Sequence, residues 1–264
     1  IDLTIRMAKE AGYHDLADII AAKGKVSKGD KVYAVQMHKS IALFQIGEEP
    51  ISSGMNILGA HIDSPRIDVK QNPLYEKEGF AYFDTHYYGG IKKYQWTAIP
   101  LSLHGRVARK DGTMVDICLG EKEDDPIFVI TDLLIHLAGE QMGKKATEVV
   151  TGENLDLLIG NIPLEKDSDT SKEEKETIKA NVLKLLADQY GIDEEDFQSA
   201  ELEIVPAGKA RDCGFDRSMV LSYGQDDRIC AFTSLFAMLD AKCGTRTQCC
   251  LLVDKEEIGS VGAT

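Results

Sequence analysis

The stretch that decides the fold covers residues 248–257 and reads QCCLLVDKEE. Its mostly apolar first part, 248–253, predicts a buried β-strand, and three carboxylates follow directly. Strands of α/β proteins border ligand sites at their carboxyl ends. Carboxylates crowded at such a place repel one another unless a cation neutralises them. The stretch therefore predicts an α/β fold with a cation site after this strand. The alternative is a solvated loop in which a glutamate caps the next helix.

A second apolar run, residues 55–61, ends in polar residues and is typical of a central sheet strand that opens on a site. His61 closes the run, and Asp63 follows it. Two residues apart on extended backbone, these side chains point to the same face. A neutral histidine binds metal ions, and a nearby carboxylate fixes its orientation. The alternative is a surface histidine or an ordinary histidine–carboxylate pair in the core.

Two adjacent aspartates, Asp226 and Asp227, head a predicted amphipathic helix over residues 226–239. An aspartate at a helix start commonly caps the helix or complements its dipole. Either carboxylate could equally bind a metal ion.

The three motifs together offer imidazole and carboxylate ligands, which suit zinc, manganese or cobalt. Two such ions bridged by a carboxylate activate water for amide hydrolysis. Of two adjacent glutamates such as Glu256 and Glu257, one can bind an ion while the other serves as a general base. The ordered set therefore indicates a metal-dependent hydrolase.

The rest of the pattern places α/β segments at both ends of the chain and β-hairpins between them. We expect one discontinuous domain of residues 1–91 and 213–264, interrupted by a β-rich domain of residues 92–212. The other predicted elements are a helix over 1–22 broken near Gly12, strands over 31–35, 41–46, 66–70, 98–108, 113–119 and 201–206, and a charged loop over 165–178 that runs into a helix ending near Tyr190.

The composition restricts the kinds of partner. The 264 residues carry 30 Lys and Arg against 44 Asp and Glu, a net charge of −14. Such an acidic chain argues against nucleic-acid binding. No window approaches 18 consecutive apolar residues, and the first residues lack the build of a signal peptide, so we expect neither a membrane span nor secretion. Six cysteines without a CxxC pair favour reduced thiols and a cytoplasmic protein.

The ordered motifs resemble the aspartyl aminopeptidase family of dinuclear metallo-aminopeptidases, close to its bacterial members. The resemblance covers about residues 31–264, and its specific stretches are 59–65 (GAHIDSP), 87–90 (YYGG), 226–228 (DDR) and 254–260 (DKEEIGS). It implies an α/β sheet-and-helix metallopeptidase catalytic domain with an inserted β-rich dimerisation domain, which agrees with the organisation expected above.

The resemblance also implies a role for each motif residue. His61 matches the first metal ligand, and Asp63 matches the carboxylate that orients it. Asp226, rather than the residue after it, matches the aspartate that bridges both ions. Glu256 matches the general base, and Glu257 matches a ligand of one ion. Two divalent ions per subunit are implied, zinc first, with manganese or cobalt as alternatives.

Two further implications concern the whole assembly. The family's remaining Asp and His ligands have no match here, so we expect the N-terminal part of such an enzyme, with an incomplete site. Family members form dimer-based dodecameric shells, which implies a homo-oligomer. In the family a histidine of the inserted domain reaches a neighbour's active site, and His136 lies at the matching place. The alternative for His136 is an ordinary interface or core histidine.

The function implied by the resemblance is a cytoplasmic metallo-aminopeptidase that removes the N-terminal residue from peptides, with a preference for acidic residues suggested by the family name. Two alternatives stay open. One is a related metal-dependent deacylase of small amides, and the other is a non-catalytic scaffold with a decayed site. The retained motif residues argue against decay.

Overall fold

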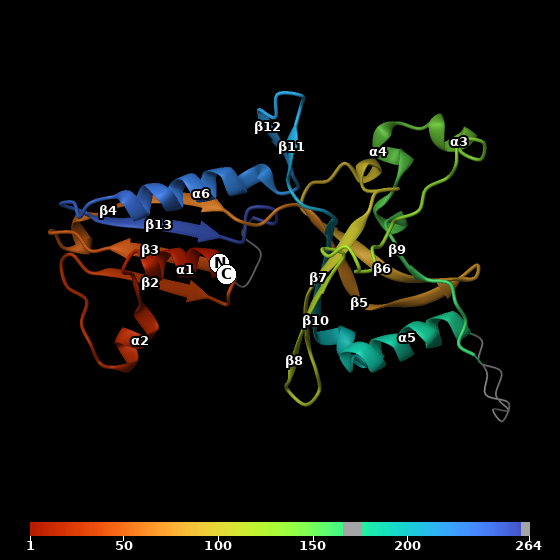
Figure 1. Ribbon diagram of the computed structural model, residues 1–264, viewed down its shortest axis with the longest axis horizontal. Coiled ribbons are helices and arrows are strands. Elements are labelled where there is room, and N and C mark those ends of the chain that lie inside the picture. Colours follow the sequence, from red (N-terminus) through yellow and green to blue (C-terminus); the bar gives the residue numbers. More distant parts are fainter. Residues whose placement is uncertain (166–175, 260–264) are drawn as a thin grey trace. The chain divides into compact units, whose positions relative to one another are not determined.

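The computed structural model describes residues 1–165 and 176–259 (Figure 1). The chain divides into two compact units. The first unit combines Ile1–Ser64 with Gly224–Thr264, and the second is Pro65–Tyr223. The second unit is therefore inserted, along the chain, between the two parts of the first. Both units contain sheets and helices, so the predicted α/β class is confirmed.

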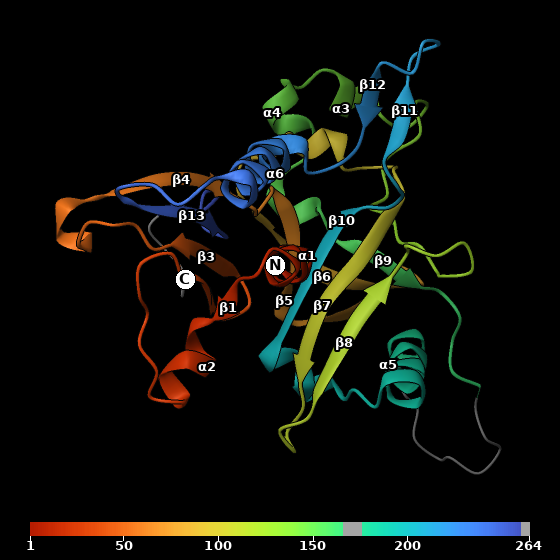
Figure 2. The same ribbon diagram turned by 60° about the vertical axis from the view of Figure 1, so that its left-hand side comes forward.

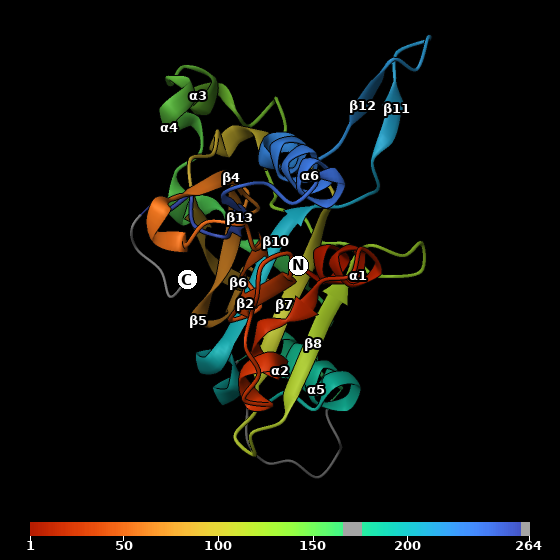
Figure 3. The ribbon, with the colours of Figure 1, turned by 90° about the vertical axis from the view of Figure 1, so that its left-hand side faces the viewer.

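The first unit is built on a five-stranded mixed sheet in the order β1-β2-β3-β13-β4. Strand β13 pairs antiparallel with β3 and parallel with β4. Helix α6 packs against β4 and β13 (Figure 3), and Figure 1 shows it lying along them. The elements of this unit are α1 (Asp2–Glu10), β1 (His14–Asp15), α2 (Leu16–Ala21), β2 (Lys31–Gln36), β3 (Ser40–Gln45), η1 (Ile51–Ser53), β4 (Met55–His61), α6 (Gln225–Asp240) and β13 (Thr247–Val253).

The core of the first unit lies where β13 meets α6. Cys250 and Leu252 of β13 and Leu235 of α6 are almost completely buried. Leu43 of β3 joins the same cluster. Along the second half of β13, Cys250 and Leu252 face this core whereas Leu251 between them is 38% exposed, which is the period of two expected of a strand.

Strand β4 has the predicted bounds but not the predicted place. It lies at one end of the strand order, so the prediction of a central strand is wrong for the described part of the chain. Ile57 and Leu58 of β4 are 58% and 43% exposed. An apolar run predicts burial but carries no information about which strand lies beside it.

The N-terminal segment forms two short helices rather than the single predicted one. Gly12 ends the first with a φ of +84°, as the predicted break near this residue anticipates. Asp15 then caps α2, since its carboxylate accepts a hydrogen bond from the backbone N–H of Ala17 at 2.8 Å.

The second unit is built on a six-stranded sheet in the order β8-β7-β10-β5-β6-β9, in which every pairing is antiparallel. Figure 2 shows β8, β7 and β10 side by side. The elements of this unit are β5 (Arg66–Lys77), β6 (Phe80–Tyr88), η2 (Lys93–Gln95), β7 (Leu101–Ala108), β8 (Met114–Leu119), α3 (Gly139–Met142), α4 (Ala146–Val149), η3 (Gly152–Asn154), β9 (Leu157–Gly160), α5 (Thr177–Tyr190), η4 (Glu194–Ser199), β10 (Ala200–Pro206), β11 (Arg211–Cys213) and β12 (Met219–Leu221).

The unit boundaries differ from the domain boundaries that we expected after residue 91 and before residue 213. Strand β5 pairs with β10, and β6 pairs with β5, so both strands belong to the sheet of the second unit. The first boundary lies at the turn signal Ser64-Pro65, whereas the prediction placed it at the break after Gly89-Gly90. The predicted charged loop over 165–178 falls largely outside the described residues. Among the described helices, none has the length and apolar character needed to cross a membrane.

Gly105 in β7 is required by a close approach between two strands. Its φ is +139°, and a Cβ at this position would lie 1.9 Å from the backbone oxygen of Glu201 in β10. We expect Gly105→Ala to lower the free energy of unfolding by about 3 kcal/mol, because both strain and overlap oppose it. Gly112→Ala is the control, since that turn glycine has nothing within 4 Å. Equal losses in urea unfolding of the two variants would contradict this account.

Candidate metal centre

The site begins where two parallel strands end together. In the register of β4 and β13, His61 lies opposite Val253. The backbone N–H of Ile62 donates to the oxygen of Val253 at 2.9 Å. Residues 61–64 and 254–257 therefore leave the sheet side by side. This is the edge of an α/β sheet at which ligands usually bind.

Asp63 ties the two exit segments together. Its side chain is fully buried. Its carboxylate accepts hydrogen bonds from the backbone N–H groups of Glu256 at 3.2 Å and Glu257 at 3.1 Å. Asp63 therefore holds the backbone of both glutamates in place.

Asp63 also orients the ring of His61. The Nδ1 atom of His61 lies 3.0 Å from the backbone oxygen of Asp63 and 3.4 Å from its carboxylate oxygen Oδ1. A carbonyl oxygen can only accept, so Nδ1 carries the proton that it donates. In the neutral ring this leaves the lone pair on Nε2, which is the atom that can bind a metal ion.

Helix α6 brings the third part of the site. The residue before its first turn is Gly224, which has a φ of +72° and provides no side-chain cap. Asp226 and Asp227 have non-helical backbone angles and are joined by a cis peptide bond. Regular helical angles begin only after Asp227, so both aspartates lie at the start of the helix, where their carboxylates also complement its dipole. The Ser64 hydroxyl donates to the backbone oxygen of Asp226 at 3.0 Å, which anchors this turn to the end of β4.

Three side chains converge at this point. Nε2 of His61 lies 3.2 Å from Oδ1 of Asp226 and 3.9 Å from Oδ2 of Asp227. One ligand atom from each residue lies within 4.8 Å of the others. Two ligands at about 2.0–2.2 Å from one ion are at most about 4.4 Å apart, so both contacts of His61 fit a shared ion. The Asp226 side chain is 93% exposed, whereas those of His61 and Asp227 are 14% and 17% exposed.

The surrounding charge favours a cation. Partial burial by itself lowers the pKa of His61, but its hydrogen bond to the backbone of Asp63 and the charges of Asp227, Asp63 and Asp226 outweigh the burial and raise the pKa above the ordinary 6.5. The carboxylates therefore stabilise positive charge at this place, whether a proton on the imidazole or a metal ion beside it. Metal binding must displace that proton, so it weakens as the pH falls.

The structure unites some predicted site residues and leaves others apart. His61, Asp63 and Asp226 lie together, and the backbone of Glu256 and Glu257 joins them through Asp63. The carboxylates of the two glutamates are not members of the converging group found among the described residues.

Asp227, which the resemblance ranked below its neighbour, is a member of that group. The one sequence feature that indicated a role for Asp227 is its position directly after Asp226. His136 lies in the second unit, exposed in a turn in which the backbone N–H of Leu137 donates to the oxygen of Leu134 at 2.9 Å.

Replacement of Asp63 tests its double role. An asparagine side chain at this position would keep the shape but present an N–H₂ group where an oxygen now accepts from Glu256 or Glu257. We expect Asp63→Asn to lower the free energy of unfolding by about 1–3 kcal/mol, because one buried N–H loses its acceptor. Asp18→Asn, at an exposed position of α2, is the control. Urea unfolding that gives the same small loss for both variants would show that Asp63 does not organise this region.

Comparisons with known proteins agree on one family. The family model described as aminopeptidase I zinc metalloprotease (M18) matches residues 4–264. A probable M18 family aminopeptidase 1 of Clostridium acetobutylicum is 57% identical over 260 residues, which cover 98% of this chain and 55% of that protein. The corresponding protein of Thermotoga maritima is 49% identical over 98% of this chain and 54% of its own length. The chain thus spans about half the length of the curated relatives it matches.

Solved structures lead to the same family. The crystal structure of aminopeptidase I from Clostridium acetobutylicum superimposes with a TM-score of 0.89 at 55% identity, over 99% of this chain and 56% of that one. A yeast structure described as the mApe1 dodecamer has a TM-score of 0.66 at 17% identity, covers 99% of this chain and 57% of that one, and shares the fold. The family resemblance seen in the sequence is confirmed, and the chain belongs to the M18 family of aminopeptidases.

Proposed function

We propose that this chain is part of a metal-dependent aminopeptidase that hydrolyses the first peptide bond of its substrates. The observation that carries the proposal is the convergence of His61 with Asp226 and Asp227 where β4 ends. An imidazole and two carboxylates within reach of one another are a ligand set for a divalent ion such as zinc. The family description as a zinc metalloprotease supports the same chemistry.

We expect two divalent ions per subunit, zinc before manganese or cobalt. Bound ions would polarise the scissile carbonyl and make a water molecule more acidic. His61 would hold one ion through Nε2, since Nδ1 is committed to Asp63. Asp226 matches the bridging aspartate of the family, and its carboxylate, which is 93% exposed, would help to hold both ions.

Glu256 is the general base in this proposal. Its backbone is held by Asp63 while its side chain is exposed, so the carboxylate can reach an attacking water. It would take a proton from that water and deliver it to the leaving amine. A positioned base of this kind needs a fixed main chain, which the buried Asp63 provides.

The third ligand has two candidates. The resemblance implies Glu257, whose backbone N–H is anchored 3.1 Å from Asp63. The converging group instead contains Asp227. We propose Glu257 as the ligand and Asp227 as its competitor. The metal content of Glu257→Ala and Asp227→Asn variants of the full-length protein decides between them, because removal of a true ligand releases metal and removal of a bystander does not.

We further propose a homo-oligomer, dimer-based and dodecameric, in which the second unit provides the dimer contact. The dodecamer named for the yeast relative supports this assembly. His136 is exposed on the second unit, so its side chain is accessible to another subunit. We propose that it contacts the active site of a neighbouring subunit. All six cysteines are free thiols, which supports a cytoplasmic location.

Metal analysis and a substrate panel on the full-length protein test the proposed activity. We expect two divalent ions per chain and release of the N-terminal residue, fastest for acidic residues. Hydrolysis of N-acylated amino acids without peptide cleavage would instead identify a deacylase. A full-length protein that binds no metal and cleaves neither substrate would be a scaffold, and would overturn the proposal.

A further inference from the structure

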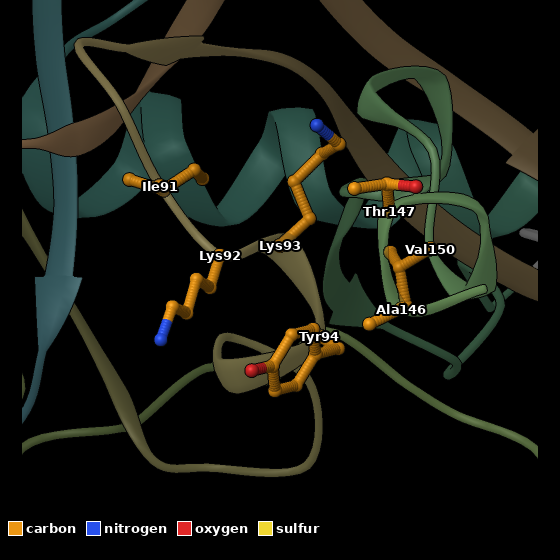
Figure 4. Close-up of a pocket in the computed structure, with 7 residues that line it drawn as sticks. All are labelled: Ile91, Lys92, Lys93, Tyr94, Ala146, Thr147 and Val150. Carbon is orange, nitrogen blue, oxygen red and sulfur yellow. The ribbon is translucent and has the colours of Figure 1, made fainter.

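The second unit contains a small cavity between two separate chain segments. One wall is the η2 region, with Ile91, Lys92, Lys93 and Tyr94, and the other wall is Ala146–Val150 at α4. Figure 4 shows the side chains of both segments around it. Its volume is about 230 Å³. Pockets for drug-sized ligands run from about 300 Å³ upward, so this cavity suits a ligand no larger than an amino acid.

The cavity carries positive charge in an acidic chain. Residues 89–94 contain two lysines and no acidic residue, and residues 144–150 contain two more lysines with a single glutamate. No ion pair joins Lys92, Lys93, Lys144 or Lys145 to a carboxylate in the part of the chain that the structure describes. Lys92 and Lys93 line the cavity, and Lys144 and Lys145 directly precede its second wall in the sequence. In a chain with a net charge of −14 this is a local exception. Ammonium groups without anionic partners attract anions.

The other lining groups indicate what kind of anion fits. Ile91, Ala146 and Val150 give the cavity aliphatic walls. Tyr94 and Thr147 add hydroxyl groups that donate hydrogen bonds. Apolar walls favour a ligand with carbon atoms next to its charge, which inorganic phosphate lacks.

The η2 segment is held in shape before any ligand arrives. The Thr97 hydroxyl donates to the backbone oxygen of Tyr94 at 3.2 Å. Nζ of Lys93 lies 4.9 Å from the ring centre of Tyr87, which steadies its ammonium group without neutralising it. Trp96, at the end of η2, is only 7% exposed and anchors the segment to the core of the unit. Pre-formed walls lower the entropic cost of binding.

We propose that this cavity binds a small organic carboxylate of the size of an acidic amino acid. Its carboxylates would pair with the lysine ammonium groups, and its carbon chain would lie against the aliphatic walls. The lining of this cavity belongs wholly to the second unit.

Calorimetric titration of the full-length protein with glutarate tests the proposal. The uncharged glutaramide and inorganic phosphate serve as comparison ligands. We expect glutarate to bind, glutaramide not to bind, and phosphate to bind more weakly, with all binding weakened by salt. Binding of glutaramide as tight as that of glutarate, tighter binding of phosphate, or no heat with glutarate would each overturn the proposal.

Variants identify the place of binding. Lys92→Met with Lys93→Met keeps the side-chain stems and should weaken glutarate binding about tenfold or more, because two charge-assisted contacts are lost. The control pair Lys23→Met with Lys25→Met removes the same charge from exposed positions of the first unit and should leave affinity unchanged.

A third variant fills the cavity without any change of charge. Ala146 is exposed at its rim, so Ala146→Leu should fold normally and should weaken glutarate binding. If the double lysine variant and its control lost the same affinity for glutarate, the binding would depend on the overall charge of the protein and not on this cavity. Unchanged binding in Ala146→Leu and in the lysine pair would place it elsewhere, and either result would overturn the proposal.

Discussion

Glu256→Gln in the full-length protein should lower peptidase turnover by roughly 100- to 10,000-fold, the usual contribution of a general base. Glutamine keeps the size and shape of the side chain but cannot take a proton from water. Asp63 binds the backbone of residue 256, and the side chain is exposed, so the substitution should leave the fold intact. Metal content should barely change.

The adjacent variant Glu257→Ala provides the matched comparison. It should weaken one metal ion and lower activity, and excess metal should restore part of its rate. Added metal should restore none of the rate of Glu256→Gln. Metal content and rates on both proteins side by side are the measurement. Loss of metal in Glu256→Gln together with full metal in Glu257→Ala would show that the two roles are exchanged.

His61→Ala should lower the affinity for zinc by more than about 100-fold. Loss of an outer-shell partner alone costs about 10- to 100-fold, and His61 is a direct ligand in this account. Asp226→Asn should act in the same direction, because an amide lacks the charge that a bridging position needs.

The control for the metal-binding variants is His14→Ala, at an exposed position of the same unit. Competition with a coloured chelator measures the affinity of each protein for zinc. If His61→Ala and His14→Ala bind zinc equally well, His61 is not a ligand. Loss of folding is monitored by circular dichroism, so that a change in affinity is not confused with unfolding.

Strands with a strong local pattern could be predicted from the sequence almost to the residue. The run at 55–61 is β4, and 248–253 is β13 extended by one residue at its start. Both are mostly apolar runs that lead into polar residues, and these are local signals. The place of β4 at the end of the strand order depends on which strands pair, and pairing is not encoded within a single run of residues.

Strand β6 could not be predicted from its local sequence. Phe80–Tyr88 was not predicted, although it pairs with β5 along most of its length. Its residues FAYFDTHYY mix aromatic and polar side chains without a clean alternation, so its stability comes from its neighbours in the sheet. The boundary between the two units was misplaced for the same reason.

The candidate site was predictable as a set of residue types but not as a geometry. The sequence places a histidine, an aspartate pair and a glutamate pair at the ends of predicted elements, and all of these residue types can serve a metal site. The double contact of Asp63 with the backbone of Glu256 and Glu257 could not be anticipated, because a carboxylate that accepts hydrogen bonds from distant backbone N–H groups leaves no pattern in the sequence. The membership of Asp227 in the converging group likewise depends on the local turn.

The most direct test of the account is the position of the metal itself. Crystals of the full-length protein grown with zinc should give an anomalous scattering peak at the zinc edge about 2.0–2.2 Å from Nε2 of His61 and from a carboxylate oxygen of Asp226. The same map shows whether Glu257 or Asp227 completes the ligand set. A zinc-loaded crystal with no anomalous peak beside His61 and Asp226 would contradict the account.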